Sequence, residues 1–330
     1  MTTNDNYGVY IIAEIGINHE GNLDRCLELV KAAHDSGANA VKLQTIDADE
    51  NYAQDTLSYK IFRDTCLSRS DTEKVFLYAQ DIHIDVFTTV GDINTANWIN
   101  ELNPSAWKIS SSLLTHIPLI EYLTALSRPL YLSTGIATTD EIDLAVDTVR
   151  KNGEIAITLM HCTSIYPTPD TLINLGTVRW LSKRYKLPVG YSDHTLGLEV
   201  SCLSVAAGAV AIEKHFTFDS SRKGLDHAIA LDPPEFSRMV EKIRITETIM
   251  GDSIRAVPIE ILEVRRNLLR HIVAGRNLPM GHQLTLEDLA IKRTNSLSDG
   301  LPPNLLSELI GRKTRRDVNL DEPMTFQLLA

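Results

Sequence analysis

The feature that most restricts the fold of this chain is a set of eight short runs rich in apolar and β-branched residues. Each run is followed by a segment in which apolar residues recur at helical spacing. The runs cover Tyr10–Ile17, Ala40–Thr45, Asp85–Val90, Ala106–Ser111, Pro129–Thr134, Ile155–Cys162, Pro188–Asp193 and Ala211–Thr217. Strands that alternate with helices form parallel sheets, because each helix carries the chain back across the sheet. Eight such units predict an α/β fold, the (β/α)8 or TIM barrel. An open doubly wound sheet is the alternative, which the absence of a GxGxxG motif disfavours.

Two of the expected helices have marked N-termini. Thr138 and Glu141 have the spacing of a capping box, in which a hydroxyl and a carboxylate each bond a free backbone amide. Asp232 and Glu235 repeat this spacing, and the prolines between them suit a first helical turn because proline lacks an N–H. We therefore expect helices to begin at these two segments.

The length leaves room for a second domain. A barrel of this kind takes about 250 residues, whereas the chain has 330. We expect the barrel in residues 1–252, a linker in 253–270 and a small, mostly β domain in 271–330. Within that domain Arg276–Gly281 is echoed by Asp317–Pro323, and this weak repeat predicts two similar turns.

Composition narrows the class of partner. The chain has 32 Lys and Arg against 43 Asp and Glu, a net charge of −11, so its overall field does not attract nucleic acid or anionic membranes. No run of about 18 apolar residues predicts a membrane span, and Met1–Tyr7 lacks the pattern of a signal peptide. The four cysteines form no CxxC pair, which favours reduced thiols over a zinc or redox site. We expect a cytoplasmic protein.

Polar residues gather at the expected C-terminal ends of the strands, where barrels of this kind place their active sites. Lys42 and Lys108 lie in the second and fourth runs, and serines and threonines follow several of the others. Two ammonium groups and converging hydroxyls suit a phosphate-bearing anion. The seventh and eighth runs contain the polar segments Ser192–His194 and Glu213–His215.

His194 and His215 stand at the ends of adjacent expected strands. Two imidazoles at that place can bind one divalent ion and leave positions for water and substrate. Such an ion acts as a Lewis acid on a carbonyl group. Glu14 and Asp226 are candidates for general acid–base catalysis or for binding a substrate hydroxyl. Carboxylates at strand ends also serve as ion-pair partners of lysines.

Eight short sequence blocks between Ile12 and His227 carry the polar residues of the expected strand ends and their neighbours. They read IAEIGINH from Ile12, VKLQT from Val41, WKISS from Trp107, LSTG from Leu132, HCTSIYPTP from His161, GYSDHT from Gly190, IEKHF from Ile212 and GLDH from Gly224. Together they resemble the sialic acid synthase family, whose members condense phosphoenolpyruvate with an amino-sugar aldehyde. The HCTxIYPTP, SDHT and ExHF blocks make this resemblance highly specific.

The resemblance implies a role for each matching residue. For phosphoenolpyruvate it implies Lys42, Thr89, Lys108, Ser111, Ser133, Ser164 and Ser192. It implies His194 and His215 for a divalent metal, Mn2+ or Mg2+, and Gln44, Tyr166 and Asp226 for the sugar. Glu14 is placed to assist water attack or proton transfer, so the implied catalytic residues are Glu14, Lys108, His194 and His215.

The C-terminal segment resembles the antifreeze-like SAF domain of the same family. In the family this domain covers the active site of the partner subunit in a domain-swapped homodimer, and an arginine of a Lys-Arg-Pro-Gly motif contacts the sugar's N-acyl group. Arg293 is the matching position, but Thr294 and Asn295 follow it in place of Pro-Gly.

Several departures from the family fall on the acceptor side. The family's Ser-Thr-Pro-Phe after the third strand reads Thr-Thr-Val-Gly from Thr88, and Leu113 replaces a glutamate. In the phosphoenolpyruvate site the one departure is Ser164, which stands where the family has an asparagine. The segment after the second strand, which in the family carries a sugar-binding asparagine, is shorter. We therefore expect the chemistry to be retained and the acceptor sugar to differ from N-acetylmannosamine.

The predicted activity is that of a phosphoenolpyruvate-dependent transferase that forms a C–C bond. It would join phosphoenolpyruvate to an N-acetylmannosamine-like amino sugar or related aldose, giving a 2-keto-3-deoxy sugar acid (a nonulosonic acid) and phosphate by metal-assisted C–O cleavage. An acceptor of the legionaminic or pseudaminic type is one alternative. An aldolase with a Schiff base on Lys42 or Lys108 is another, and an inactive sugar-acid-binding homologue is the third.

Overall fold

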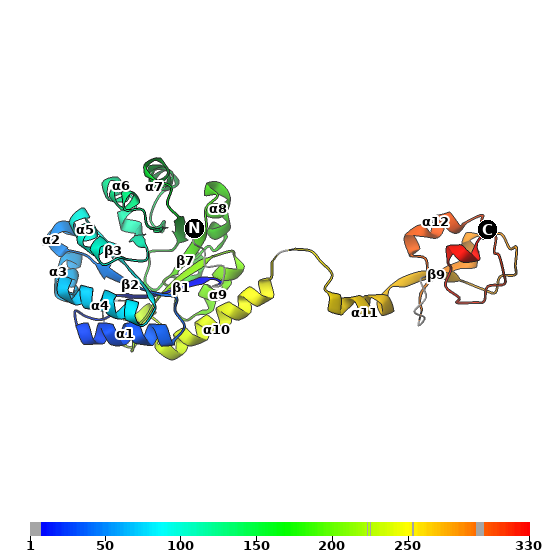
Figure 1. The fold of residues 1–330 in the computed structure, drawn as a ribbon, viewed down its shortest axis with the longest axis horizontal. Helices are drawn as coiled ribbons and strands as arrows, with labels where there is room; N and C mark the ends of the chain where they lie inside the picture. Colours follow the sequence, from blue (N-terminus) through cyan, green and yellow to red (C-terminus); the bar gives the residue numbers. More distant parts are fainter. Residues whose placement is uncertain (1–7, 223, 225, 253, 295–299) are drawn as a thin grey trace. The chain divides into compact units, whose positions relative to one another are not determined.

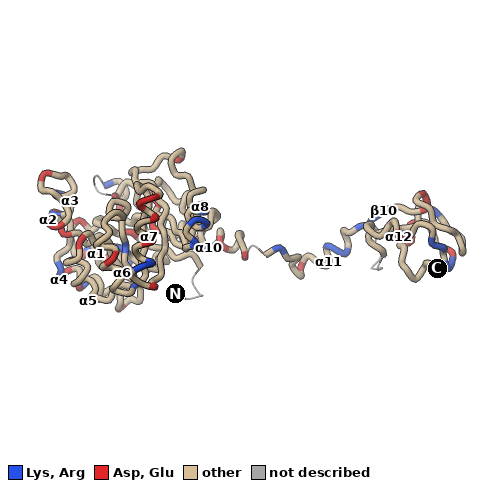
Figure 2. Tube along the Cα trace, turned by 90° about the horizontal axis from the view of Figure 1, so that it is seen from above, with Lys and Arg blue, Asp and Glu red and all other residues tan. Residues whose placement is uncertain are grey.

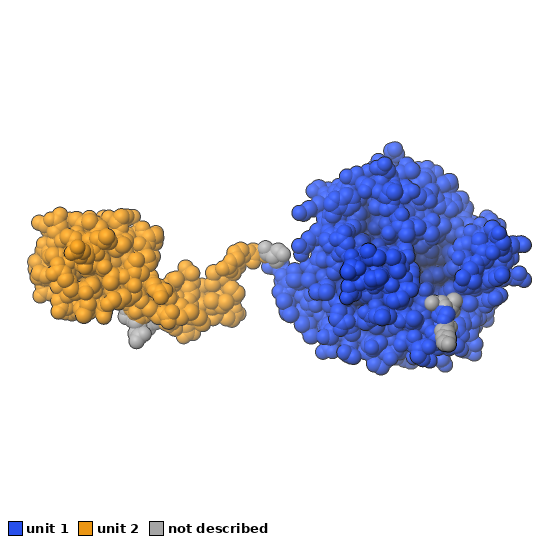
Figure 3. All heavy atoms as spheres, turned by 180° about the vertical axis from the view of Figure 1, so that it is seen from behind, with its two compact units in different colours: residues 1–252 blue, residues 253–330 orange. Residues whose placement is uncertain are grey.

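The computed structural model describes residues 8–222, 224, 226–252, 254–294 and 300–330. Met1–Tyr7, the segment found above to lack the pattern of a signal peptide, lies outside these residues, as do Leu225 of the GLDH block and Asn295. The chain divides into two compact units, Met1–Asp252 and Ser253–Ala330 (Figure 3). Each unit has a buried apolar core of its own.

The first unit is a closed barrel of eight parallel strands in sequence order (Figure 1). The strands are β1 (Tyr10–Gly16), β2 (Ala40–Thr45), β3 (Asp85–Val90), β4 (Trp107–Ile109), β5 (Leu130–Ser133), β6 (Ile157–His161), β7 (Val189–Asp193) and β8 (Ala211–His215). Pairing of β1 with β8 closes the barrel, so the predicted fold is confirmed and the open sheet is wrong. β4 is shorter than predicted, because the chain leaves the ladder at Ser110 and enters a 3₁₀ turn at Ser111–Leu113.

Helices cover the outside of the barrel. They are α1 (Leu23–Asp35), α4 (Arg69–Asp81), α5 (Ile93–Glu101), α6 (Ile117–Ala125), α7 (Thr139–Asn152), α8 (Gly176–Tyr185), α9 (Glu199–Ala206) and α10 (Pro233–Met250), with α2 (Ala48–Asn51) and α3 (Leu57–Thr65) inserted after β2. The capping box of Thr138 and Glu141 is confirmed, and the Asp232 side chain accepts from the Glu235 amide. No helix among the described residues is long and apolar enough to cross a bilayer.

The interior of the barrel is layered, because alternate residues of each strand point inward. One layer is apolar and includes Ile12, Ala40, Phe87 and Ala106. Two residues further along the same four strands stand Glu14, Lys42, Thr89 and Lys108, all buried. The period of two therefore places a polar layer directly above an apolar floor, at the C-terminal ends of the strands.

The second unit is small and contains short strands. It holds α11 (Ile259–Leu268), the antiparallel pair β9 (Arg270–Ala274) and β10 (Leu289–Arg293), and α12 (Leu306–Leu309). Its sequence repeat corresponds to two turns that pair through Leu278 and Val318, whose backbones exchange two hydrogen bonds of 2.8 Å. Residues 253–330 carry 11 Lys and Arg against 9 Asp and Glu, so the acidic excess belongs to the barrel unit; Figure 2 shows basic residues along α11.

Candidate active site

A cavity of about 550 Å³ opens at the C-terminal ends of the barrel strands. With the exception of Ser164, every residue of the barrel unit assigned above to substrate or metal lines it: Glu14, Lys42, Gln44, Thr89, Lys108, Ser111, Ser133, Tyr166, Ser192, His194, His215 and Asp226. Arg293 is exposed at the end of β10 in the second unit.

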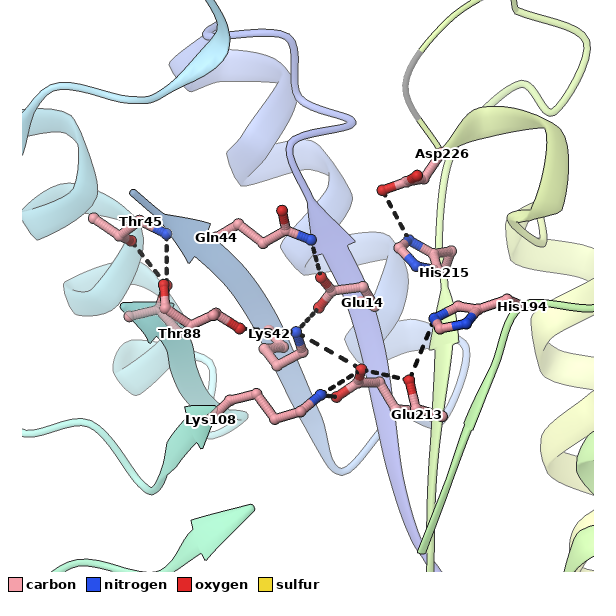
Figure 4. Close-up of polar contacts among 12 residues, drawn as sticks. Glu14, Lys42, Gln44, Thr45, Thr88, Lys108, His194, Glu213, His215 and Asp226 are labelled. Atoms are coloured by element: carbon pink, nitrogen blue, oxygen red, sulfur yellow. Dashed lines mark hydrogen bonds and ion pairs between the residues drawn. The ribbon is translucent and has the colours of Figure 1, made fainter. Parts of the chain in front are cut away.

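Each lysine of the cavity is held by a carboxylate (Figure 4). Lys42 Nζ lies 2.8 Å from Glu14 Oε2 and 3.3 Å from the Thr89 hydroxyl. Lys108 Nζ donates to both oxygens of Glu213 at 2.7 Å. Glu213 Oε1 also lies 3.8 Å from Lys42 Nζ, so the two pairs form one buried network that joins β1, β2, β4 and β8.

Burial and charge act on these groups in opposite directions. Burial raises the pKa of Glu14 to about 7, although Lys42 opposes the shift. Burial disfavours the ionised form of Glu213 as well, but its two lysine neighbours outweigh this and hold its pKa well below the usual range. Burial lowers the pKa of Lys108. At Lys42 the negative charges of Glu14 and Glu213 outweigh the effect of burial and raise the pKa. Glu213 is therefore the fixed negative charge of the network, and Glu14 is the member that can gain a proton.

The two histidines lie side by side, with ring centroids 5.6 Å apart (Figure 4). His194 Nδ1 is 2.9 Å from the carbonyl oxygen of Thr163 and must donate to it. His194 Nε2 is therefore an acceptor, and it lies 3.1 Å from the Tyr166 hydroxyl and 3.5 Å from the Ser192 hydroxyl. His215 Nδ1 is buried without a hydrogen-bond partner, 3.6 Å from Asp226 Oδ2. Burial lowers the pKa values of His194 and His215 to about 4 and about 3, so both rings are neutral near pH 7.

Hydroxyl groups border the lysine side of the cavity. Ser192 Oγ donates to Glu213 at 2.9 Å, and Ser111 Oγ accepts from the Gly135 amide at 3.0 Å. A Cβ at Gly135 would lie 2.6 Å from the Cys162 sulfur and 2.8 Å from Ser164 Oγ. Glycine thus lets the chain pass close to these groups, and Ser164 lies near Gly135 without lining the cavity.

The sequence analysis assigned no role to Glu213, although it binds both lysines. A signal was present, since Glu213 precedes His215 by two residues and therefore shares its face of β8. The intervening Lys214 points the other way: it is fully buried, 3.4 Å from Asp193, and neither residue lines the cavity. One of the three residues in each polar segment at the ends of β7 and β8 is thus structural, and the other two line the cavity.

Residues between β2 and β3 supply a part of the cavity that the sequence analysis did not foresee. They are Ile46, Asn51, Tyr52, Ile61 and Phe62. Asn51 Nδ2 donates to Asp92 Oδ2 at 3.1 Å. No periodic pattern marks these residues, because their positions depend on how α2 and α3 fold over the strand ends.

Known families and proteins match most of this chain. Residues 29–255 match the NeuB family and residues 270–330 match the SAF domain. The chain is 38% identical to an uncharacterized protein of Methanocaldococcus jannaschii, over 95% of this chain and 92% of that protein. It is 34% identical to the N,N'-diacetyllegionaminic acid synthase of Legionella pneumophila, over 96% and 93% of the two chains.

A solved structure is similar as well. The N-acetylneuraminic acid (sialic acid) synthetase of Leptospira borgpetersenii, solved in complex with citrate, superposes with a TM-score of 0.76 at 31% identity, covering 80% of this chain and 93% of that one. The resemblance drawn from the strand-end blocks and from the C-terminal segment is thereby confirmed. The chain belongs to the NeuB family and carries a C-terminal SAF domain.

Proposed function

We propose that this protein condenses phosphoenolpyruvate with an amino-sugar aldose to give a 2-keto-3-deoxy sugar acid and phosphate. The observation that carries the proposal is one cavity that combines two buried lysines, several hydroxyls and two neutral imidazoles. The relatives named as legionaminic acid and sialic acid synthases support it. In this reaction C3 of phosphoenolpyruvate bonds to the aldehyde carbon, water adds at C2, and the bond from C2 to the phosphate oxygen breaks.

The lysines would bind the phosphate and carboxylate of phosphoenolpyruvate, with Thr89, Ser111, Ser133 and Ser192 as hydroxyl donors. The resemblance also implies Ser164, but this residue does not line the cavity and makes no direct contact with the ligand in this proposal. Both ammonium groups are already paired with carboxylates, so a trianion entering the cavity must be offset by more than the lysines alone. Because burial raises the pKa of Glu14 to about 7 while the lysines hold the pKa of Glu213 low, Glu14 is only partly charged near neutrality and competes less with the ligand than Glu213 does.

The residues fit a divalent metal, Mn2+ or Mg2+. His194 Nε2 and the unpartnered His215 Nδ1 are lone-pair donors on neighbouring strands, and imidazole nitrogen is a common ligand of such ions. Within the part of the chain that the structure describes, no group of three or more His, Cys, Asp or Glu is placed to hold a metal, so water and the acceptor would complete the coordination. When bound there, the ion would polarise the aldehyde carbonyl as a Lewis acid.

Glu14 would act on the water or on a proton of the reacting sugar. Its Oε1 accepts from Gln44 Nε2 at 2.8 Å, which fixes the carboxyl plane toward the cavity. Lys108 would stabilise the charge that develops on the departing phosphate. Tyr166 and Asp226 lie beside the histidines and Gln44 lies beside Glu14, and these three side chains would hold the sugar hydroxyls.

The assembly is part of the same proposal. We propose a cytoplasmic homodimer in which the SAF domain of one subunit reaches the cavity of the other, with Arg293 on the sugar's acyl group. The match of residues 270–330 to the SAF domain supports this arrangement, as does the exposure of α11, on which no residue is buried. The division into a barrel of residues 1–252, a linker of 253–270 and a SAF domain of 271–330 belongs to it.

A phosphate-release assay tests the proposed reaction. The purified protein is given phosphoenolpyruvate, Mn2+ and each of a panel of aldoses, and the products are weighed by mass spectrometry. We expect phosphate release that needs an aldose and yields an acid whose mass equals that of the aldose plus pyruvate. His194→Ala and His215→Ala should each abolish the metal-dependent release, and near-wild-type release by either variant would contradict the metal assignment.

Two other outcomes would overturn the proposal itself. Covalent trapping of pyruvate on Lys42 or Lys108 by borohydride, without any need for metal, would assign an aldolase. Binding of phosphoenolpyruvate with no release of phosphate for any aldose would assign an inactive homologue.

A further inference from the structure

A second cavity opens at the opposite end of the barrel from the candidate active site. Its volume is about 800 Å³. Most of its lining residues begin a strand or lie just before one, and none of them also lines the candidate active site. The polar side chains of this second cavity, here called the N-terminal cavity, include Tyr10, Asn39, Asp85, Ser105, Tyr131 and Thr158.

An apolar layer separates the two cavities. It includes Ile12 and Phe87, which are fully buried. Tyr10 and Asp85 precede these residues by two positions on β1 and β3, so they lie on the same inward face of their strands. The rings of Tyr10 and Tyr131 pack against the layer and line the N-terminal cavity. The period of two that places buried lysines on one side of the layer therefore places tyrosines and a carboxylate on the other.

Asp85 is the one carboxylate of the N-terminal cavity, and its hydrogen bonds are incomplete. The Tyr10 hydroxyl donates to Asp85 Oδ2 at 2.5 Å. Asp85 Oδ1 has no hydrogen-bond or ion-pair partner among the residues that the structure describes. The Tyr131 ring stacks on Phe87 with centroids 5.5 Å apart and an interplanar angle of 17°, and its hydroxyl has no partner in the described part of the chain. Two oxygen acceptors of this cavity are therefore available to a donor from outside.

The electric potential in the N-terminal cavity is negative. Burial raises the pKa values of Tyr10 and Tyr131, and the charge of Asp85 raises both further. Glu213 acts on Tyr131 in the same direction, and no cation opposes either shift. Among its described lining residues there is no lysine or arginine. A concave site with a carboxylate and tyrosine rings attracts a cation and repels an anion.

The remaining surface combines apolar faces with hydrogen-bonding groups. Pro129 and Pro188 belong to the apolar part. Asn39 Oδ1 accepts from the Ile11 amide at 2.8 Å, which leaves the Asn39 amide group free to donate. Small-molecule sites usually have volumes of about 300–1,000 Å³, a range that includes this cavity. A ligand about the size of one sugar ring, with hydroxyl groups beside a charged amine, matches this surface.

We infer that the N-terminal cavity binds a small protonated amine that carries hydroxyl groups, with its ammonium group between Asp85 Oδ1 and the Tyr131 hydroxyl. The hydroxyl groups of the ligand would bond to Asn39, Ser105 and Thr158. This inference does not rest on the proposed function, because the two cavities share no lining residue.

Matched ligands test the inference by calorimetric titration of the full-length protein. The methyl glycosides of glucosamine and of glucose differ in one group, an ammonium against a hydroxyl, at about pH 6.5, where an amine of this kind is protonated. Neither glycoside can open to an aldehyde, so neither can serve as an acceptor in the candidate active site. The glucosamine derivative should bind at least about 10-fold more tightly, because a hydrogen bond between charged groups is stronger than one between neutral groups.

Variants locate the bound amine. Asp85→Asn keeps the shape of the side chain and should weaken binding of the glucosamine derivative by about 10-fold or more. Tyr131→Phe removes one hydroxyl and should weaken it by about 2- to 10-fold. Asp81→Asn is the matched control and should leave the affinity unchanged, because Asp81 is exposed at the end of α4 and does not line the cavity. Urea denaturation of each variant shows whether the barrel is still folded.

Three results would overturn the inference. The first is equal affinity for the two glycosides, or no binding of the glucosamine derivative. The second is wild-type affinity in a folded Asp85→Asn variant. The third is displacement of the glucosamine derivative by excess phosphoenolpyruvate, which would place the amine in the candidate active site.

Discussion

Glu14 is the residue whose protonation bears most directly on activity. Burial raises its pKa to about 7, so its carboxylate fraction grows as the pH rises through neutrality. If this carboxylate accepts a proton in the reaction, kcat rises with pH and levels off above about 7. The histidines do not contribute to this rise, because burial lowers their pKa values to about 4 and about 3 and they are already neutral at pH 6.

Glu14→Gln tests this assignment. We expect kcat to fall by about 10²- to 10⁴-fold and the residual activity to lose its rise near pH 7, measured as phosphate release at saturating substrate. Asp226→Asn is the control and should keep the rise. Because the pKa of Glu14 is raised from 4.5 to about 7, the folded protein keeps this proton to a higher pH than the unfolded chain does. The contribution of Glu14 to the free energy of unfolding therefore decreases as the pH rises from about 4.5 to about 7. A residual pH profile identical to wild type in Glu14→Gln would assign the rise to another group.

Gly16 shows how one backbone position shapes the site. Its φ of 54° lies in the left-handed region, and a Cβ there would be 3.1 Å from Glu14 Oε1 and 3.2 Å from Gln44 Nε2. Gly16→Ala should therefore disturb the Glu14–Gln44 hydrogen bond and add about 1–2 kcal/mol of backbone strain.

Gly208→Ala separates these two effects. Gly208 has a φ of 105°, but a Cβ there meets nothing within 4 Å. Both variants should lower the free energy of unfolding in urea by a similar amount, whereas only Gly16→Ala should lower kcat by more than about 10-fold. Equal activity of the two variants would show that the Glu14–Gln44 contact is dispensable.

At the scale of elements, a buried ion pair fixes β7 to β8 behind the histidines. Asp193 Oδ2 lies 3.4 Å from Lys214 Nζ and accepts from the Ser201 hydroxyl of α9 at 2.6 Å. Lys214 also donates to the Thr195 carbonyl at 2.6 Å. His194 and His215 are the next residues along the two strands, so this pair sets the distance between them.

Removing one partner of such a pair leaves an unpaired buried charge. Lys214→Met should lower the free energy of unfolding by about 3–5 kcal/mol, measured by urea denaturation. Lys183→Met, at an exposed position of α8, should lower it by less than about 0.5 kcal/mol. The double variant Asp193→Leu with Lys214→Met should be more stable than Lys214→Met alone, and a further loss in the double variant would contradict this account.

The same scale shows what the sequence could and could not predict. All eight strands were predicted, because alternation of β-rich runs with helical segments is a local property of the chain, and the polar residues at their ends indicated the cavity. The link between Lys108 and Glu213 could not be predicted, since it joins β4 to β8 across 105 residues. Nor could the stack of the Tyr52 and Phe62 rings at the cavity, because it depends on how two short helices pack over the strand ends. The motifs therefore identified the residues of the site, whereas the interaction partners of those residues are determined by the tertiary structure.

At the scale of the whole molecule, the separate cores of the two units predict that the barrel folds alone. Residues 1–252 as a fragment should keep the cooperative unfolding of the barrel in urea, because every contact of its core lies within the unit. The fragment should nevertheless have a higher KM for the acceptor, since it lacks Arg293. A wild-type KM for the fragment would remove the SAF domain from the proposed site.

Mixed subunits decide whether the SAF domain serves its own barrel or that of the partner. A subunit with His215→Ala keeps Arg293, and a subunit with Arg293→Ala keeps both histidines, so each is defective in a different unit. In a domain-swapped dimer, the barrel of the second variant receives Arg293 from the first, and one of the two sites becomes intact. Random pairing after co-refolding at equal amounts then restores about one quarter of the sites. Without a swap no site combines both intact parts, and activity stays at the mean of the two separate variants. Phosphate release by the mixture, compared with each variant refolded alone, therefore distinguishes the two assemblies.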